Sequence, residues 1–162
     1  MDKIIVLGIG NILISDEGFG VRVVEKLQEC YEFPDNVQLL DGGTMGYELL
    51  HRLIGIQKLI LIDAVNGGAA PGTLFRFSGP EVNAYYRQKV SMHQLGIQEV
   101  LAMLEITDNT VPDLLVLGVQ PASLEFGLDL SPIIEAAAET VAAQVITQLK
   151  DWQIPVAPFP SC

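Results

Sequence analysis

The sequence predicts a three-layer α/β domain in which a twisted, mostly parallel sheet lies between helices. Two observations favour this fold class: short runs rich in Val, Ile and Leu have the length of fully buried strands, and segments with helical periodicity separate them. The chain has 162 residues, of which 49% are hydrophobic, and this suits one domain with its own core. Residues 1–162 are therefore expected to form a single domain.

Five runs are predicted to be strands. Four have the continuous apolar character of buried parallel strands: Lys3–Gly8, Val37–Asp41, Lys58–Asp63 and Leu114–Val119. The fifth, Thr73–Phe77, alternates in polarity after the turn at Ala70–Gly72, a pattern typical of an antiparallel or edge strand.

Helices are predicted between these strands, where apolar residues recur at helical spacing. The internal segments are Val21–Leu27, Met45–Ile54 and Gln94–Leu104. A last helix is expected to begin at Ser131 and Pro132, with Ser131 as its cap, and to run to about Lys150. Three prolines in Gln153–Cys162 cannot continue a helix, so residues 153–162 are expected to be an extended tail.

The charge of the chain excludes several classes of partner. Nine Lys and Arg residues against 20 Asp and Glu give a net charge of −11, whereas nucleic acids and anionic membranes are bound by clustered cations.

No apolar run reaches the roughly 20 residues of a membrane helix, and Met1–Leu7 lacks the layout of a signal peptide. Cys30 and Cys162 lie far apart in the sequence, and reduced thiols are expected. We therefore expect a cytoplasmic protein that binds neither nucleic acid nor membrane.

Open α/β sheets bind ligands outside the carboxyl ends of their strands, so the residues that follow each strand are the candidates for function. The first strand runs into Gly8–Gly20. A dinucleotide-binding GxGxxG motif would need glycine where Leu13 stands, and the acids Asp16 and Glu17 would repel a pyrophosphate. Asp16 fits a helix cap, which leaves Glu17 available for another task.

Two further strands end in carboxylates. Asp41 is followed by Gly42, Gly43 and Thr44, where glycine lets the backbone turn sharply or approach a ligand closely. The alternative is an ordinary turn capped by Asp41 or Thr44. Asp63, at the end of an apolar strand, is either a turn residue or a functional group that points into the crevice at the edge of the sheet.

The chain has two histidines. His51 lies within a predicted helix and is expected to be exposed, whereas His93 precedes another helix, where a hydrogen-bonded structural role is the ordinary alternative to metal binding. If His93 meets Glu17 and Asp63, the two carboxylates and the imidazole would form an open site for a divalent ion. The spacing of these residues matches no local metal motif, so only the fold could bring them together.

Five blocks of residues stand in order along the chain. They are Gly8–Leu13 with Ser15–Gly18, Asp41–Thr44, Ile62–Ala64, Ser91–Gly96, and Gly118–Pro121 with Ser123–Glu125. Together they resemble the hydrogenase maturation proteases, which are endopeptidases specific for the large subunit of nickel–iron hydrogenases. The resemblance covers nearly the whole chain. Where many members have two aspartates, this chain has Asp16 and Glu17, a change that keeps the carboxylate.

The resemblance implies a mainly parallel five-stranded sheet and an enzyme that removes a C-terminal peptide from the nickel-loaded precursor of the large subunit. It implies that Glu17, Asp63 and His93 are metal ligands that recognise the nickel already bound to the precursor. No permanent cofactor is then expected, and Cd²⁺ or Zn²⁺ could replace nickel in vitro. The expected partner is the precursor alone, for which a monomer suffices.

The resemblance also links Asp41 with substrate selection or cleavage, and its neighbours Gly42, Gly43 and Thr44 with substrate binding. Such enzymes have been grouped with aspartic proteases, whose two carboxylates lie about 3 Å apart and share a proton. Nothing in the sequence brings two carboxylates that close, so either Asp41 or Asp63 is expected to assist the attacking water.

Two kinds of alternative stay open. One is a metal-dependent binding or chaperone module that inspects the same hydrogenase subunit without cutting it. The other is a different α/β protein, similar to peptidyl-tRNA hydrolase or to a dinucleotide-binding enzyme. The charge of −11 and the absent third glycine of the dinucleotide motif count against the second kind.

Overall fold

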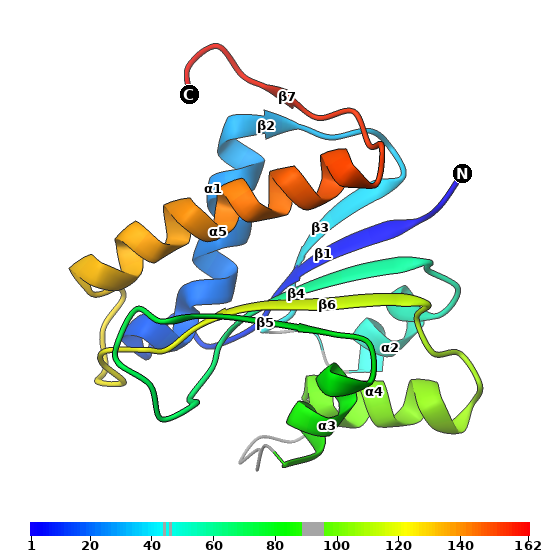
Figure 1. Cartoon of the computed structure of the whole chain (residues 1–162), viewed down its shortest axis with the longest axis horizontal. Helices are drawn as coiled ribbons and strands as arrows, with labels where there is room; N and C mark the ends of the chain where they lie inside the picture. Colours follow the sequence, from blue (N-terminus) through cyan, green and yellow to red (C-terminus); the bar gives the residue numbers. More distant parts are fainter. Residues whose placement is uncertain (44, 46, 89–95) are drawn as a thin grey trace.

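A five-stranded sheet with the order β3-β1-β4-β6-β5 forms the centre of the protein (Figure 1). The computed structural model describes residues 1–43, 45, 47–88 and 96–162. The strands of this sheet are β1 (Ile4–Gly8), β3 (Val37–Asp41), β4 (Lys58–Ala64), β5 (Leu74–Ser78) and β6 (Asp113–Val119). All neighbours in the sheet pair in parallel except β5, which is antiparallel to β6. The mainly parallel five-stranded sheet is therefore confirmed, and so is the antiparallel edge strand.

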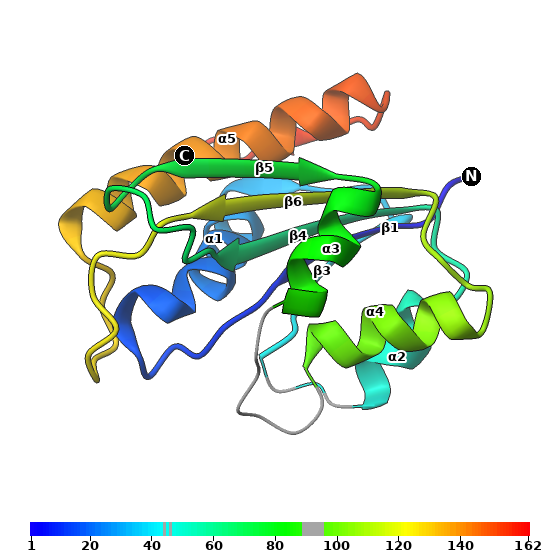
Figure 2. The same ribbon diagram turned by 60° about the horizontal axis from the view of Figure 1, so that its bottom comes forward.

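Helices cover both faces of the sheet (Figure 2). One face is covered by α1 (Phe19–Cys30) and α5 (Pro132–Asp151), and the other by α2 (Tyr47–Leu53), α3 (Pro80–Gln88) and α4 (Ile97–Ile106). The predicted three-layer architecture is confirmed. Helix α3 was not predicted from the sequence. None of the helices in the described part of the chain is long and apolar enough to cross a membrane.

The buried strands contribute side chains to two cores, one on each side of the sheet. In β4, Ile60 and Ile62 pack toward α1 and α5, whereas Leu59 and Leu61 pack toward α2, α3 and α4. Successive side chains of a strand point to opposite faces, so a strand covered on both faces needs apolar residues at every position. This double burial explains why the central strands are continuous apolar runs in the sequence.

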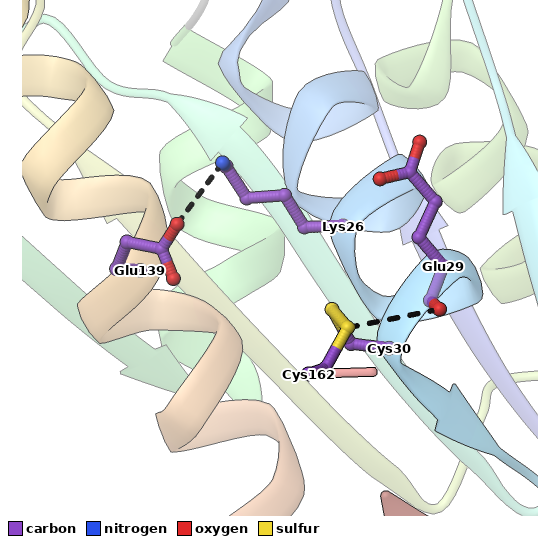
Figure 3. The surroundings of a disulfide bond; sticks show 5 residues. All are labelled: Lys26, Glu29, Cys30, Glu139 and Cys162. Carbon is purple, nitrogen blue, oxygen red and sulfur yellow. Dashed lines mark hydrogen bonds and ion pairs between the residues drawn. A yellow bond between two sulfur atoms is a disulfide. The ribbon is translucent and has the colours of Figure 1, made fainter. Parts of the chain in front are cut away.

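The C-terminal tail is attached to the end of α1. It contains β7 (Ala157–Pro158), which pairs antiparallel with β2 (Tyr31–Glu32), and the amide of Phe159 donates a hydrogen bond of 2.8 Å to the carbonyl of Cys30. The expected reduced thiols are wrong, because Cys30 and Cys162 form a disulfide (Figure 3). The tail brings the two Cα atoms to 5.4 Å, within the range of disulfides, although 132 residues separate them.

Candidate functional site

The carboxyl ends of β1 and β4 form the point at which the strand order of the sheet reverses. From β1 the chain passes through α1 to β3 on one side of β1, and from β3 it passes through α2 to β4 on the other side. The connection after β1 leads to α1 on one face of the sheet, whereas the connection after β4 leads through β5 to α3 on the other face. At such a point α/β proteins bind ligands in the crevice beyond the strand ends. Glu17 follows β1 and Asp63 lies near the end of β4, so both predicted carboxylate ligands are at this crevice.

Close backbone packing fixes the segment that carries Glu17. This residue belongs to the short 3₁₀ helix η1 (Ser15–Gly18), which leads into α1. A Cβ atom at Gly20 would overlap the carbonyl oxygen of Ile62, and one at Gly10 would overlap the carbonyl oxygen of Glu17. Only glycine permits such an approach, so these two positions let the start of α1 lie directly against β1 and β4.

Asp63 is fully buried and lies on the face of the sheet that α3 covers. Its carboxylate oxygen Oδ2 accepts a hydrogen bond of 3.1 Å from the hydroxyl of the buried Tyr86. Burial raises the pKa of Tyr86 well above its ordinary value, and the negative charges of Asp63 and Glu17 raise this pKa further. The phenol of Tyr86 therefore keeps its proton and acts as a donor. Both carboxylates therefore lie within electrostatic range of this one phenol.

Asp41 lies at the same edge of the sheet but belongs to its other face. Asp41 is in register with Gly8, which is in register with Ile62, so Asp41 shares the orientation of Ile62 and is opposite to Asp63. Two strand spacings of about 4.8 Å separate β3 from β4. Oδ1 of Asp41 accepts a hydrogen bond of 2.8 Å from the amide of Gly43. This register gives no support to a proton shared between Asp41 and Asp63.

The turn after β3 packs against the loop after β1. The amide of Gly42 donates a hydrogen bond of 2.8 Å to the carbonyl of Gly8, and a Cβ atom at Gly43 would lie 2.5 Å from the carbonyl oxygen of Gly10. The predicted substrate-binding glycines thus adjoin the crevice. Thr44 and His93 lie outside the described residues.

Glu17 and Asp63 are two of the three predicted metal ligands. In the described ranges 1–43, 45, 47–88 and 96–162, no three His, Cys, Asp or Glu residues are grouped so that they could hold a metal ion. The third predicted ligand, His93, lies beyond those ranges. His51, the other histidine, is exposed on α2 as predicted.

A cavity of about 380 Å³ opens beside Glu17. Aromatic rings from β5 and α3 line it, and Leu124 lines it from the loop after β6. Phe77 stacks on Tyr85 with ring centroids 5.3 Å apart, and Tyr85 meets Tyr86 edge to face at 4.8 Å. One chain of ring contacts therefore connects the wall of the cavity with the donor to Asp63.

The loop after β4 is held by a buried side chain whose role sequence reasoning did not identify. Oε1 of Gln120 accepts hydrogen bonds from the amides of Gly67 (2.8 Å) and Ala69 (3.2 Å), and its Nε2 donates to Oδ1 of Asn66 at 3.1 Å. A polar residue directly after a buried strand was the available signal for Gln120, whereas nothing near Tyr86 in the sequence indicates a contact with Asp63.

Asp16 has a different role from the predicted helix cap. It is fully buried, and neither η1 nor α1 has a side-chain cap. Its carboxylate accepts hydrogen bonds from the amides of Ala122 (2.9 Å), Ser123 (2.8 Å) and Ser131 (2.7 Å). Ser131 occupies the cap position of α5, but its hydroxyl also donates to Asp16, at 2.8 Å, and makes no capping bond. The prediction was wrong because a distant loop, invisible in the local sequence, supplies the donors.

Comparisons with known proteins identify relatives over nearly the whole chain. Residues 21–148 match the family described as hydrogenase maturation protease. The chain is 43% identical over 157 residues to the hydrogenase 2 maturation protease of Escherichia coli (strain K12), with 96% of each chain covered. It is 45% identical over 158 residues to the hydrogenase expression/formation protein HupM of Azotobacter chroococcum mcd 1, covering 96% of this chain and 76% of that protein.

Solved structures agree with this result. The hydrogenase maturating endopeptidase HybD from E. coli superimposes with a TM-score of 0.92 at 41% identity, and the match covers 99% of both chains. The [NiFe] hydrogenase maturation protease HycI from Thermococcus kodakarensis KOD1 has a TM-score of 0.74 at 25% identity, and the match covers 91% of this chain and 92% of that one.

Proposed function

This chain belongs to the hydrogenase maturation protease family, and from this we propose that it removes the C-terminal peptide from the nickel-loaded precursor of a nickel–iron hydrogenase large subunit. The observation that supports the proposal is that the charges of Glu17 and Asp63 both act on the buried phenol of Tyr86, beside a cavity of about 380 Å³ that Glu17 lines. The relatives' names supply the class of substrate. We further propose that the processing takes place in the cytoplasm.

Nickel is part of the substrate in this proposal. Glu17 and Asp63, with His93 as the third ligand, complete the coordination of an ion that the precursor already holds. Carboxylate oxygen and imidazole nitrogen suit a borderline divalent ion. Ligands must be deprotonated to bind, so recognition weakens as the pH falls and the carboxylates and imidazole become protonated. A precursor without nickel lacks the ion that joins it to the enzyme, and it therefore escapes cleavage.

Asp63 and Asp41 have separate roles in the proposed cleavage. As a metal ligand next to the reacting groups, Asp63 has its negative charge engaged by the ion and is a weak base. The ion polarises the scissile carbonyl, and Asp41, one of whose oxygens is held by Gly43, assists the attacking water. Two strand spacings of about 4.8 Å correspond to about three residues of extended peptide. A substrate strand laid across the sheet edge therefore passes both Asp63 and the turn with Gly42 and Gly43, and we propose that Thr44, the next residue in the sequence, also contributes to substrate binding.

The experiment incubates the protein with purified nickel-loaded and nickel-free precursor and follows the mass of the large subunit. We expect shortening of the loaded form alone, and no shortening with Glu17→Gln or Asp63→Asn. Glu139→Gln is the matched control, because Glu139 is an exposed acid of α5 that pairs with Lys26. Binding of the precursor without any change in its mass would instead identify a non-cutting chaperone, and equal cleavage by the two site variants would contradict the ligand assignment.

A further inference from the structure

Four large apolar side chains are exposed together beside the crevice. They form what we call the apolar ridge: Leu13, Leu124, Phe126 and Leu128. Their exposed fractions lie between 54% for Leu124 and 92% for Phe126. Two segments distant in sequence meet here, since the amide of Gly127 donates to the carbonyl of Leu13 and the amide of Ser15 donates to the carbonyl of Gly127, both at 2.9 Å.

The backbone under the ridge is firmly held although its side chains are exposed. Asp16 binds the amides of Ala122 and Ser123 at one end and Ser131 at the other, and Arg22 donates a hydrogen bond of 2.8 Å to the carbonyl of Leu128. A loop anchored at these points cannot bury its apolar side chains by a local collapse. Clustered apolar exposure of this kind marks an interaction site on a soluble domain.

The ridge is continuous with the candidate active site. Leu124 is both a member of the ridge and a lining residue of the cavity that Glu17 borders. A protein whose C-terminal segment occupies the crevice must therefore cover the ridge with its adjoining surface. Two acidic residues accompany the ridge: Glu125 lies between Leu124 and Phe126, and Asp129 follows Leu128. Their negative charges favour a partner with Lys or Arg at the matching positions.

We propose that the apolar ridge is the docking surface for the folded body of the hydrogenase large-subunit precursor, and that it receives an apolar patch bordered by Lys or Arg. The inference rests on the proposed function and extends it from the cleaved segment to a second contact outside that segment. Exposed aromatic residues at the centre of an interface contribute disproportionately to affinity. Phe126 is therefore expected to be the principal anchor of the interface.

The test compares Phe126→Ser with Ile106→Ser in steady-state cleavage of nickel-loaded precursor. Ile106 is the matched control, because it is 77% exposed at the end of α4, in the connection that leads to the amino end of β6. For Phe126→Ser we expect KM to rise about 10- to 100-fold while kcat and the affinity for Cd²⁺ stay within twofold of the wild type. The control should leave all three values unchanged. Glu125→Gln should slow association with the precursor and reduce its dependence on salt.

Each outcome distinguishes the docking proposal from the proposed function. An unchanged KM for Phe126→Ser overturns the docking surface and leaves the protease assignment intact. If the wild type does not cleave the precursor, the protease assignment fails, and the Kd for purified precursor then tests docking alone. A wild-type dimer that dissociates in Phe126→Ser, with KM unchanged, would assign the ridge to a second copy of this chain and overturn the proposal.

Discussion

Tyr86→Phe isolates the hydrogen bond that orients Asp63. The substitution removes only the hydroxyl that donates to Oδ2 of Asp63 at 3.1 Å, and it retains the ring that packs edge to face on Tyr85. The phenol keeps its proton because burial and the nearby carboxylates raise the pKa of Tyr86. The variant therefore loses a donor across the whole working pH range without losing a charge.

The expected size of the effect follows from two independent estimates. A hydrogen bond to a charged group contributes about 1.5–3 kcal/mol. Loss of the partner that orients a metal ligand lowers metal affinity about 10- to 100-fold, which is about 1.4–2.7 kcal/mol. The two ranges overlap, so we expect Tyr86→Phe to weaken Cd²⁺ binding by one to two orders of magnitude, on the order of 1.4–2.7 kcal/mol.

Calorimetric titration with Cd²⁺ measures this affinity without the precursor. Tyr47→Phe is the matched control, because Tyr47 is 74% exposed at the start of α2 and its hydroxyl can be removed without altering a buried contact. Thermal unfolding of the metal-free variants separates a loss of stability from a loss of affinity. A Tyr86→Phe protein that binds Cd²⁺ as tightly as the wild type, while Asp63→Asn does not bind it, would refute the positioning role.

Four further predictions concern stability and the shape of the site. Asp16→Ala leaves the amides of Ala122, Ser123 and Ser131 without their acceptor and should lower the free energy of unfolding in denaturant by about 3 kcal/mol, with Asp16→Asn less affected. Gly20→Ala forces a Cβ atom against the carbonyl of Ile62, so we expect its free energy of unfolding to fall by about 1–3 kcal/mol and its affinity for Cd²⁺ to decrease. An unchanged affinity for Cd²⁺ would show that this packing does not set the position of Glu17. Reduction of the Cys30–Cys162 disulfide should lower the free energy of unfolding by about 2–5 kcal/mol. The free energy of unfolding of Cys162→Ser should be the same with and without reductant. Tyr86 keeps its proton in the folded state because its pKa is raised, whereas an unfolded tyrosine loses its proton near pH 10. The contribution of Tyr86 to the free energy of unfolding is therefore complete below about pH 10 and falls above it by up to about 1.4 kcal/mol per pH unit. The free energy of unfolding of Tyr86→Phe should fall less steeply above this pH.

The strands could be predicted from the sequence because each central strand is buried on both faces. A run such as Lys58–Asp63 has few alternatives to a buried parallel strand once helical segments flank it, and β4 extends that prediction by one residue. Helix α3 has no comparable signal, since only Val82 and Tyr86 of its nine residues are buried. The disulfide was missed for a related reason: the pairing of β2 with β7 that brings Cys162 to Cys30 involves two residues in each strand.

Contacts of the candidate site were less predictable than its individual residues. Glu17 and Asp63 could be singled out as acids after strands, but which acid meets which depends on the strand order, and β1 separates β3 from β4. The strand order, with β4 beside β1, combines with the small volume of Gly10 and Gly20 to bring η1 against the end of β4. The register of β3 and β4 with β1, by contrast, places Asp41 on the other face.

The adjacent acids Asp16 and Glu17 illustrate how one short segment serves two purposes. Asp16 points its carboxylate at the loop between β6 and α5 and binds three backbone amides there, whereas Glu17 borders the cavity. Because the two residues are consecutive in η1, the bonds that fix Asp16 also fix the backbone of Glu17. Asp16 thus holds both the loop under the apolar ridge and the backbone next to the proposed metal ligand Glu17. A substitution of Asp16 should therefore weaken docking of the precursor and metal binding together. Phe126→Ser, by contrast, should weaken docking alone.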